Sequence, residues 1–299
     1  MTTIISQDSV FTAADELWTD AEDRPAPAPF KKFYALNDSL LFFSGDIDAI
    51  LSALSMYIGS LIGVDEEFAE LMGQAAELDM RTYELIEIDR STGKIVYEYG
   101  SSRIEEHGCI FYGLGSGSDY ALNSFINSMG IILNSGKPFK FPEHGHNLIT
   151  TCMQHAFQLD ECSGGKIAHI VWGDDGVVSD CLAWVPSPEL ESYHCAIIAK
   201  IHERFGTKEE LRELIAGQLD EEKQDAKELE IETKIFDQVD DRAYSSQNSL
   251  AAKGRTSMNN TTEQKPRVAV KTSGSSRGKV FSSAALKERM AQRKAEGLS

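Results

Sequence analysis

The chain has 299 residues, of which 41% are hydrophobic and 25% are charged, the balance of a globular protein with one or two domains. No run approaches 18 uninterrupted apolar residues, and the N-terminus lacks a basic flank and a long apolar stretch, so we expect neither a membrane span nor a signal peptide. Five widely spaced cysteines without a C-x-x-C pair indicate reduced thiols in a cytoplasmic protein, rather than a disulfide framework or a zinc site.

The net charge of −18 is distributed unevenly along the chain. Residues 242–299 carry 12 Lys/Arg against 3 Asp/Glu, whereas residues 1–241 carry 17 against 44, a charge of −27. We do not expect so acidic a body to bind nucleic acid. The basic tail could bind an acidic partner protein, nucleic acid or the chain's own body, and composition does not choose among these.

Hydrophobic periodicity predicts strand pairs that alternate with helix pairs. Alternation with a period of two predicts strands, and apolar residues three and four apart predict helices. The elements predicted in chain order are strands within 3–14, 33–36 and 40–43, helices at 47–61 and 66–80, a hairpin at 82–100, a strand at 109–115, helices at 118–133 and 147–161, strands at 166–173 and 177–185, and a helix at 189–206. This order predicts an α+β domain over residues 1–206, with sheets packed together and helices outside.

Three further segments are predicted beyond this domain. Thr207 and Glu210 form a capping box, which predicts an acidic helical extension over residues 207–239. Residues 240–281 are rich in Ser, Thr, Asn, Gly and Lys and predict a disordered linker. Residues 282–299 predict a short basic helix, marginal by itself. We expect residues 242–299 to be separable, so that their removal leaves the fold and any activity intact but abolishes binding of a larger partner.

The N-terminus has the residue types needed for a nucleophile. A threonine hydroxyl needs a base, and removal of Met1 would leave the α-amine of Thr2 beside its own hydroxyl. An α-amine titrates near ~8, so part of it is neutral at physiological pH and can accept the proton. A cation would keep the pKa of this amine low, and an anion would hold that cation. Lys32 and Asp15, each at a strand edge of neighbouring hairpins, are suitably placed for these two tasks.

Five segments together resemble the proteasome-type threonine peptidases, which are N-terminal nucleophile hydrolases. In chain order the segments read TTII, AAD, KKFYALNDSLLFFSGD, GLGSGSDYAL and LDECSGG, and the resemblance covers residues 2–205. Each segment is weak alone, but all five follow the family's order with similar spacing. The resemblance implies a four-layer αββα sandwich, hydrolysis of peptide or protein substrates through an acyl-enzyme, a homo-oligomer and no cofactor. The last 90 or so residues have no counterpart in the family.

The resemblance also implies a catalytic set, which consists of Thr2, Asp15, Lys32, Ser116, Asp160 and Ser163. In this set Thr2 is the nucleophile through its hydroxyl and the general base through its amine. Lys32 lowers the pKa of that amine, and Asp15 orients Lys32. The other three residues are expected to form a hydrogen-bonded shell around the amine.

Five positions are implied in substrate binding. The backbone N–H of Gly45 is expected to be the oxyanion donor, and the backbone of Thr19 is expected to pair with an extended substrate. Phe43, or Ser44 if the alignment slips by one, should floor the pocket for the residue before the scissile bond and favour small or medium apolar side chains. Asp46 replaces a glycine of the family pattern and places a carboxylate near the mouth of the cleft.

Other interpretations compete with this one. The turn GLGSGSDYA resembles a nucleotide-binding loop, although its glycines do not have the G-x-G-x-x-G spacing. Glu143, His144 and His146 could hold a metal ion, although they lie in a predicted loop with no further ligand in register. Two other functions also stay open: an assembly protein that acts through its basic tail, and a small-molecule amidohydrolase on the same fold.

Overall fold

The computed structural model describes residues 2–20, 24–26, 30–136, 141–182, 184–185, 189–220 and 278–298. The chain divides into two compact units, one formed by Met1–Leu211 with Gly274–Ser299 and the other by Arg212–Ser273. The second unit is described only over residues 212–220, which are helical. The predicted linker before residue 278 and the predicted helix after residue 220 lie outside the described residues.

Six antiparallel strands form the first sheet, in the order β12-β11-β2-β1-β10-β9. Their bounds are β1 Ile4–Gln7, β2 Phe11–Asp15, β9 Ser102–Glu106, β10 Cys109–Leu114, β11 Ile167–Gly173 and β12 Gly176–Asp180. The predicted first hairpin is confirmed, with Ser9 at a positive φ of 61° in its turn. Strand β9 was not predicted, because it is an edge strand whose single apolar residue, Ile104, gives no periodic signal.

The second sheet has the order β13-β7-β6-β5, with β8 also paired to β7. Its strands are β5 Phe33–Ala35, β6 Ser39–Gly45, β7 Thr82–Asp89, β8 Ile95–Tyr99 and β13 Lys279–Val280, all antiparallel. A separate two-stranded ribbon pairs β3 Trp18–Thr19 with β4 Pro25–Ala26.

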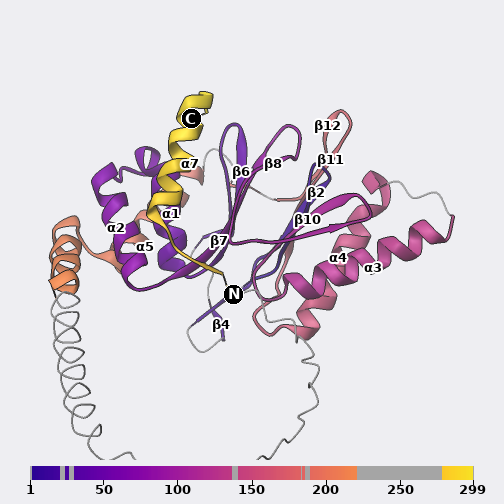
Figure 1. Ribbon diagram of the computed structural model, residues 1–299, viewed down its shortest axis with the longest axis horizontal. Coiled ribbons are helices and arrows are strands. Elements are labelled where there is room, and N and C mark those ends of the chain that lie inside the picture. Colours follow the sequence, from indigo (N-terminus) through magenta and orange to yellow (C-terminus); the bar gives the residue numbers. More distant parts are fainter. Residues whose placement is uncertain are drawn as a thin grey trace, which may run out of the picture. The chain divides into compact units, whose positions relative to one another are not determined.

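Helices flank both sheets, as Figure 1 shows. Helices α3 Ser118–Asn134 and α4 Phe141–Leu159 contact β10 and β11, whereas α1 Ile47–Ile62 contacts β6 and β7. The helices α2 Glu66–Leu78, α5 Leu190–Phe205 and α7 Ser283–Glu296 pack around α1. This mixture of helices and antiparallel sheets agrees with the predicted α+β class. Among the residues that the structure describes, no helix is both long and apolar enough to cross a bilayer.

The apolar core lies on both faces of the first sheet. Ile4 and Ile170 from this sheet share one cluster with Phe42 and Ile86 from the second sheet, so the two sheets pack against each other. On the opposite face, Phe11 belongs to a second cluster that α3 and α4 supply. Strand β1 is buried on both faces, since Ile4 belongs to the first cluster and the adjacent Ile5 to the second.

The helix after α5 begins as the sequence predicts. The backbone N–H of Thr207 donates to Glu210 Oε2 at 2.8 Å, and the Glu210 N–H donates back to Thr207 Oγ1 at 3.3 Å. This reciprocal pair is the predicted capping box, and it starts the helix that is described over residues 208–220.

The C-terminal tail requires a correction. A helix does form where the sequence predicts one, but Leu286, Arg289 and Arg293 of α7 are buried against the rest of the first unit. Lys279 and Val280, which fall in the predicted linker, form β13 instead. Docking on the chain's own body was one of three alternatives for the tail, because composition shows a basic amphipathic helix but not the acidic surface of the same unit that accepts it. The effect of deleting residues 242–299 stays a prediction.

Candidate active site

The first residues of the chain are enclosed by the loop that follows β10. Thr2 and Thr3 are 1% and 0% exposed. A Cβ on Gly115 would lie 1.9 Å from the carbonyl oxygen of Thr2, and one on Gly117 would lie 1.9 Å from Thr3 Oγ1. These glycines therefore let the loop lie directly on the N-terminal backbone, which explains the GLGSGS segment without a nucleotide.

Thr2, Asp15 and Lys32 meet in one buried cluster. Lys32 Nζ donates to Asp15 Oδ1 at 2.9 Å and also to Thr2 Oγ1, which in turn donates to Asp15 Oδ1. The Asp15 carboxylate is fixed by the backbone N–H groups of Thr3, at 3.1 Å, and Gly164, at 2.9 Å. Burial lowers the pKa of Lys32, and the Asp15 carboxylate beside it opposes that shift. The structure thus brings together the three residues that sequence reasoning ranked first.

The other three residues of the predicted set form a second group. Ser116 Oγ donates to Asp160 Oδ2 at 2.7 Å, and Ser163 Oγ donates to the same oxygen. The hydroxyls of Ser163 and Thr3 lie 2.5 Å apart. This group therefore joins the N-terminal strand at Thr3, one residue beyond the expected nucleophile.

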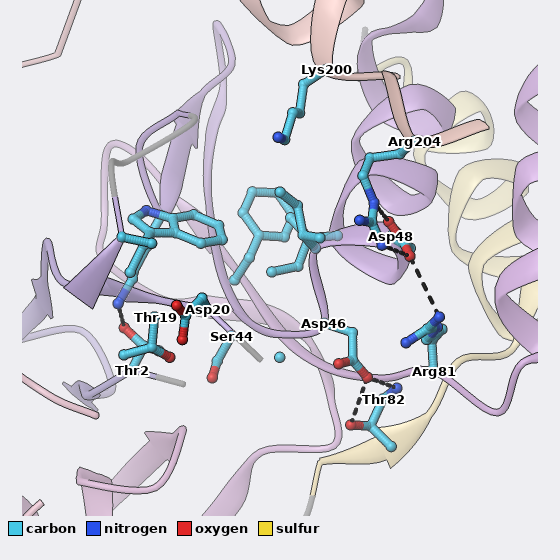
Figure 2. A pocket seen from close by; sticks show the side chains of 17 residues that line it. Thr2, Thr19, Asp20, Ser44, Asp46, Asp48, Arg81, Thr82, Lys200 and Arg204 are labelled. Atoms are coloured by element: carbon cyan, nitrogen blue, oxygen red, sulfur yellow. Dashed lines mark hydrogen bonds and ion pairs between the residues drawn. The ribbon is translucent and has the colours of Figure 1, made fainter. Parts of the chain in front are cut away.

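A cleft of about 640 Å³ opens from Thr2 and is shown in Figure 2. Every residue predicted to bind substrate lines it, namely Thr19, Phe43, Ser44, Gly45 and Asp46. The structure adds a wall that the sequence did not indicate, which includes Asp48, Arg81, Thr82, Lys200 and Arg204. No motif marks these positions, because they come from α1, α5 and the start of β7 with the residue before it, which only the fold brings to the cleft.

Gly45 ends β6 in a conformation that other residues rarely adopt. Its φ is +116°, and a Cβ there would lie 2.4 Å from the carbonyl oxygen of Thr82. Phe43 N donates to the Lys32 carbonyl at 2.9 Å, whereas Asp46 N donates to Thr82 O at 2.8 Å. Because backbone groups alternate along an antiparallel strand, the N–H of Gly45 faces the same side as that of Phe43, toward the Lys32 segment.

The added wall is rich in charge. Arg204 makes a bidentate ion pair with Asp48, both N–O distances being 2.6 Å, and Arg81 Nη2 lies 3.8 Å from the same carboxylate. Lys200, one turn before Arg204 on α5, points into the cleft in Figure 2 and pairs with Glu203 at 2.7 Å. The Asp48 carboxylate therefore interacts with two guanidinium groups at this end of the cleft.

Glu84 is a buried carboxyl on β7 that the sequence did not single out. Its side chain accepts a hydrogen bond from the backbone N–H of Gly115, the glycine that lies on the Thr2 carbonyl. Burial raises the pKa of Glu84 to about 7; the nearby Asp119 adds to the rise, and hydrogen bonds from Gly115 and Ser44 oppose it. A carboxyl that titrates near neutrality therefore lies directly behind the loop that encloses the N-terminus.

The alternative metal site finds little geometric support. His146 Nδ1 lies 2.9 Å from His169 Nε2, and the side chain of Glu143 lies outside the described residues. In the part of the chain that the structure describes, no group of three His, Cys, Asp or Glu side chains is arranged to hold a metal ion. The five cysteines are all free thiols.

The chain was also compared with known proteins. No family model and no curated protein matches it. Among solved structures, eukaryotic HslV from Trypanosoma brucei is 19% identical to this chain; the match covers 57% of this chain and 98% of the HslV chain, with a TM-score of 0.35. The function is therefore inferred from the geometry of the cleft and from the sequence motifs.

Proposed function

We propose that this protein is a threonine peptidase whose nucleophile is the hydroxyl of Thr2. The observation that carries the proposal is the buried contact of Lys32 Nζ with both Thr2 Oγ1 and Asp15 at the end of a cleft. A buried lysine paired with a carboxylate is common in proteins, but here the ammonium also contacts a hydroxyl that lines a cavity. This arrangement suits activation of a weak nucleophile.

The proposed fold is the four-layer αββα sandwich of N-terminal nucleophile hydrolases. Support comes from the two sheets, which share a core, and from the helices on the outer side of each. The order of the five sequence motifs supports the same assignment. Each motif lies at the N-terminal strand or next to it, or next to the cleft.

The proposed reaction is acyl transfer to Thr2 after Met1 has been removed. The Thr2 hydroxyl oxygen attacks the carbonyl carbon of the scissile amide while the Thr2 amine takes the hydroxyl proton. The Gly45 N–H stabilises the resulting oxyanion. The C–N bond then breaks, the proton passes from the amine to the leaving nitrogen, and water hydrolyses the Thr2 ester that remains. Lys32 contributes positive charge beside the amine, and Asp15 holds Lys32 in place.

The substrate class follows from the shape of the cleft and from the resemblance. A cavity of about 640 Å³ with Thr19 on its wall has room for an extended peptide. The proposal includes a homo-oligomer in the cytoplasm, peptide or protein substrates and no cofactor, as the resemblance implies. A small-molecule amide would be attacked by the same nucleophile in the same reaction, so the two substrate classes differ only in how they would fill the cleft.

A substrate screen with two matched variants tests the proposal. Wild-type protein, Thr2→Ser and Thr2→Ala are compared on peptide, protein and small-amide substrates. Both variants keep a small second residue, so removal of Met1 is expected in each. The serine variant keeps a hydroxyl and should retain measurable turnover, whereas the alanine variant should have none. Turnover by Thr2→Ala equal to that of the wild type would refute the assignment of the nucleophile.

A further inference from the structure

The C-terminal strand pairs with the segment that forms one wall of the cleft. Strand β13 aligns Lys279 with Tyr83 and Val280 with Thr82, and the N–H of Phe281 donates to the carbonyl of Arg81 at 2.8 Å. It extends the edge of β7 at the point where β8 ends, since β8 pairs only from Leu85 onward. Residues nearly 200 positions apart in the sequence therefore meet behind the cleft.

The opposite edge of the same segment holds the proposed oxyanion glycine. Thr82 accepts a hydrogen bond from Asp46 N at 2.8 Å and donates its own N–H to Asp46 Oδ2 at 2.7 Å. Gly45 lies against the Thr82 carbonyl and the Tyr83 backbone. Backbone bonding along this segment thus alternates between its two edges: the Thr82 carbonyl accepts from Asp46 on the β6 side, and the Arg81 carbonyl accepts from Phe281 on the tail side.

Side chains reinforce the contact between the tail and this wall. Phe281 is 1% exposed and packs on Tyr83 with ring centroids 5.1 Å apart, and Tyr83 stacks on Tyr99 at 4.9 Å. Gly73 on α2 lies beside the Phe281 ring, since a Cβ there would lie 3.4 Å from it, in ordinary contact. Gly100 similarly accommodates the backbone of Lys279, which lies 3.2 Å from the position of its Cβ.

A buried ion network holds α7 in the same position. Glu87 of β7 is 0% exposed and accepts hydrogen bonds from Arg289, at 2.8 Å, and from Arg293. Arg293 also donates to Ser39 at 3.0 Å and to Asp38 at 3.2 Å. The positive charge of the tail is therefore matched to buried and half-buried acceptors of this chain.

We infer that residues 278–298 are a positioning element for the cleft, in which docking of β13 and Phe281 on β7 fixes the Arg81–Tyr83 wall and, through it, Gly45 and Asp46. This element touches neither Thr2 nor the cleft, so it acts through the wall. Only the expected change in kcat and KM rests on the proposed function. Its structural readout is the protection of the Gly45 and Asp46 amides from hydrogen exchange.

A pair of full-length variants tests the inference. Phe281→Ala removes the side chain that packs on Tyr83, whereas Leu286→Ala removes an equally buried side chain from α7 that is not paired with β7. Both truncate the buried face of the tail, so both lower stability. Phe281→Ala is expected to speed amide exchange at residues 43–48 and 81–83 at least tenfold and to lower kcat more than it raises KM. In Leu286→Ala, the amide exchange rates of these residues, kcat and KM should stay near their wild-type values.

Two controls keep the outcome decisive. Urea unfolding gives the free energy of unfolding of both variants, so that a general loss of stability is separated from a local loss of protection at residues 43–48. If Phe281→Ala does not fold, Phe281→Leu is compared with Leu286→Ala in the same way, with a smaller expected change. Equal exchange at residues 43–48 in both variants would overturn the inference. Inactive wild-type protein with the expected exchange pattern would refute the peptidase proposal while leaving the positioning role intact.

Discussion

Two buried clusters in this protein join carboxylates to cations, and they differ in what else they contain. In the Thr2 cluster, Lys32 and Asp15 share contacts with a hydroxyl that lines a cleft of about 640 Å³. In the Glu87 cluster, the same kind of ion pair is enclosed between the second sheet and α7, where Arg289 and Arg293 are at most 3% exposed. Both clusters desolvate their charges, which costs free energy unless every partner is in place.

The difference shows how a buried ion pair relates to function. Burial and pairing alone describe both clusters and so identify neither as a site. What distinguishes the Thr2 cluster is a nucleophile within hydrogen-bond distance of the cation and open space beside that nucleophile. The Glu87 cluster also contains a hydroxyl beside its cation, because Arg293 donates to Ser39 Oγ at 3.0 Å, but Ser39 is not among the residues that line the neighbouring cavity of about 910 Å³. Apart from the Tyr57 hydroxyl on Glu87, the contacts of this cluster join the tail to the body.

The largest expected effect is the loss of activity in Lys32→Ala. Removal of a positioned acid–base element typically lowers the rate by about 10²–10⁴. Lys31→Ala is the matched control, because its side chain is directed over the Phe33 ring rather than toward Thr2, and we expect it to be mild. The measurement is kcat/KM on the best substrate of the screen. Similar decreases in kcat/KM in both variants would mean that Lys32 is not specifically the cation beside Thr2.

The second effect concerns stability and the other cluster. Glu87→Gln leaves Arg289 and Arg293 buried beside an uncharged amide, and breaking a buried ion pair in this way costs about 3–5 kcal/mol. The control is Tyr57→Phe, which removes only the hydroxyl that donates to Glu87 at 3.1 Å and should cost about 1 kcal/mol. Urea unfolding of both variants measures this. Equal, small losses would show that the tail is not held by its charges.

The third effect is a pH dependence that Glu84 introduces. Its pKa rises from the ordinary 4.5 to about 7 on folding, so the protonated carboxyl favours the folded state. The stabilisation is complete below pH 4.5 and is lost as the pH rises through about 7. Glu84→Gln has no group that titrates there, so its free energy of unfolding should rise by about 3 kcal/mol relative to that of the wild type as the pH increases from 4.5 to above 7. A difference in unfolding free energy that does not change with pH would contradict the environment described for Glu84.

The smallest effect belongs to an exposed ion pair. Lys208 Nζ lies 2.9 Å from Asp65 Oδ2 and 3.2 Å from Glu67 Oε2, on the surface of the first unit. Such pairs are well solvated and screened by salt. Lys208→Ala should therefore change the Tm little, and the change should disappear at high salt. A large decrease in Tm that does not depend on salt would show that the difference in burial does not explain why this ion pair contributes less than the two buried clusters.

The sequence predicted the class of fold and the proximity of Thr2, Asp15 and Lys32, for a definite physical reason. Thr2 and Asp15 flank the two strands of one hairpin, so their approach follows from that hairpin, whereas Lys32 precedes a strand of the second sheet and reaches them because the two sheets pack together. Helix α4 was predicted to begin at residue 147 but begins at Phe141, because the EHGH segment was interpreted as a loop.

Other features could not be derived from local patterns. Lys200 and Arg204 are ordinary polar positions of a surface helix until the fold brings α5 to the cleft. Glu84 lies in a strand where an acidic residue normally faces solvent. The docking of the tail depends on Glu87, which lies about 200 residues earlier in the chain and which composition cannot identify.

The most direct test of the central claim is the intact mass of the protein after reaction with an epoxyketone, an inhibitor that requires both the hydroxyl and the free amine of an N-terminal threonine. The account predicts that the mature protein begins at Thr2, one Met lighter than the translated chain, and gains the mass of one inhibitor molecule on that residue. Thr2→Ala should gain none. Protein that begins at Thr2, hydrolyses a peptide substrate and forms no adduct on Thr2 would contradict the account.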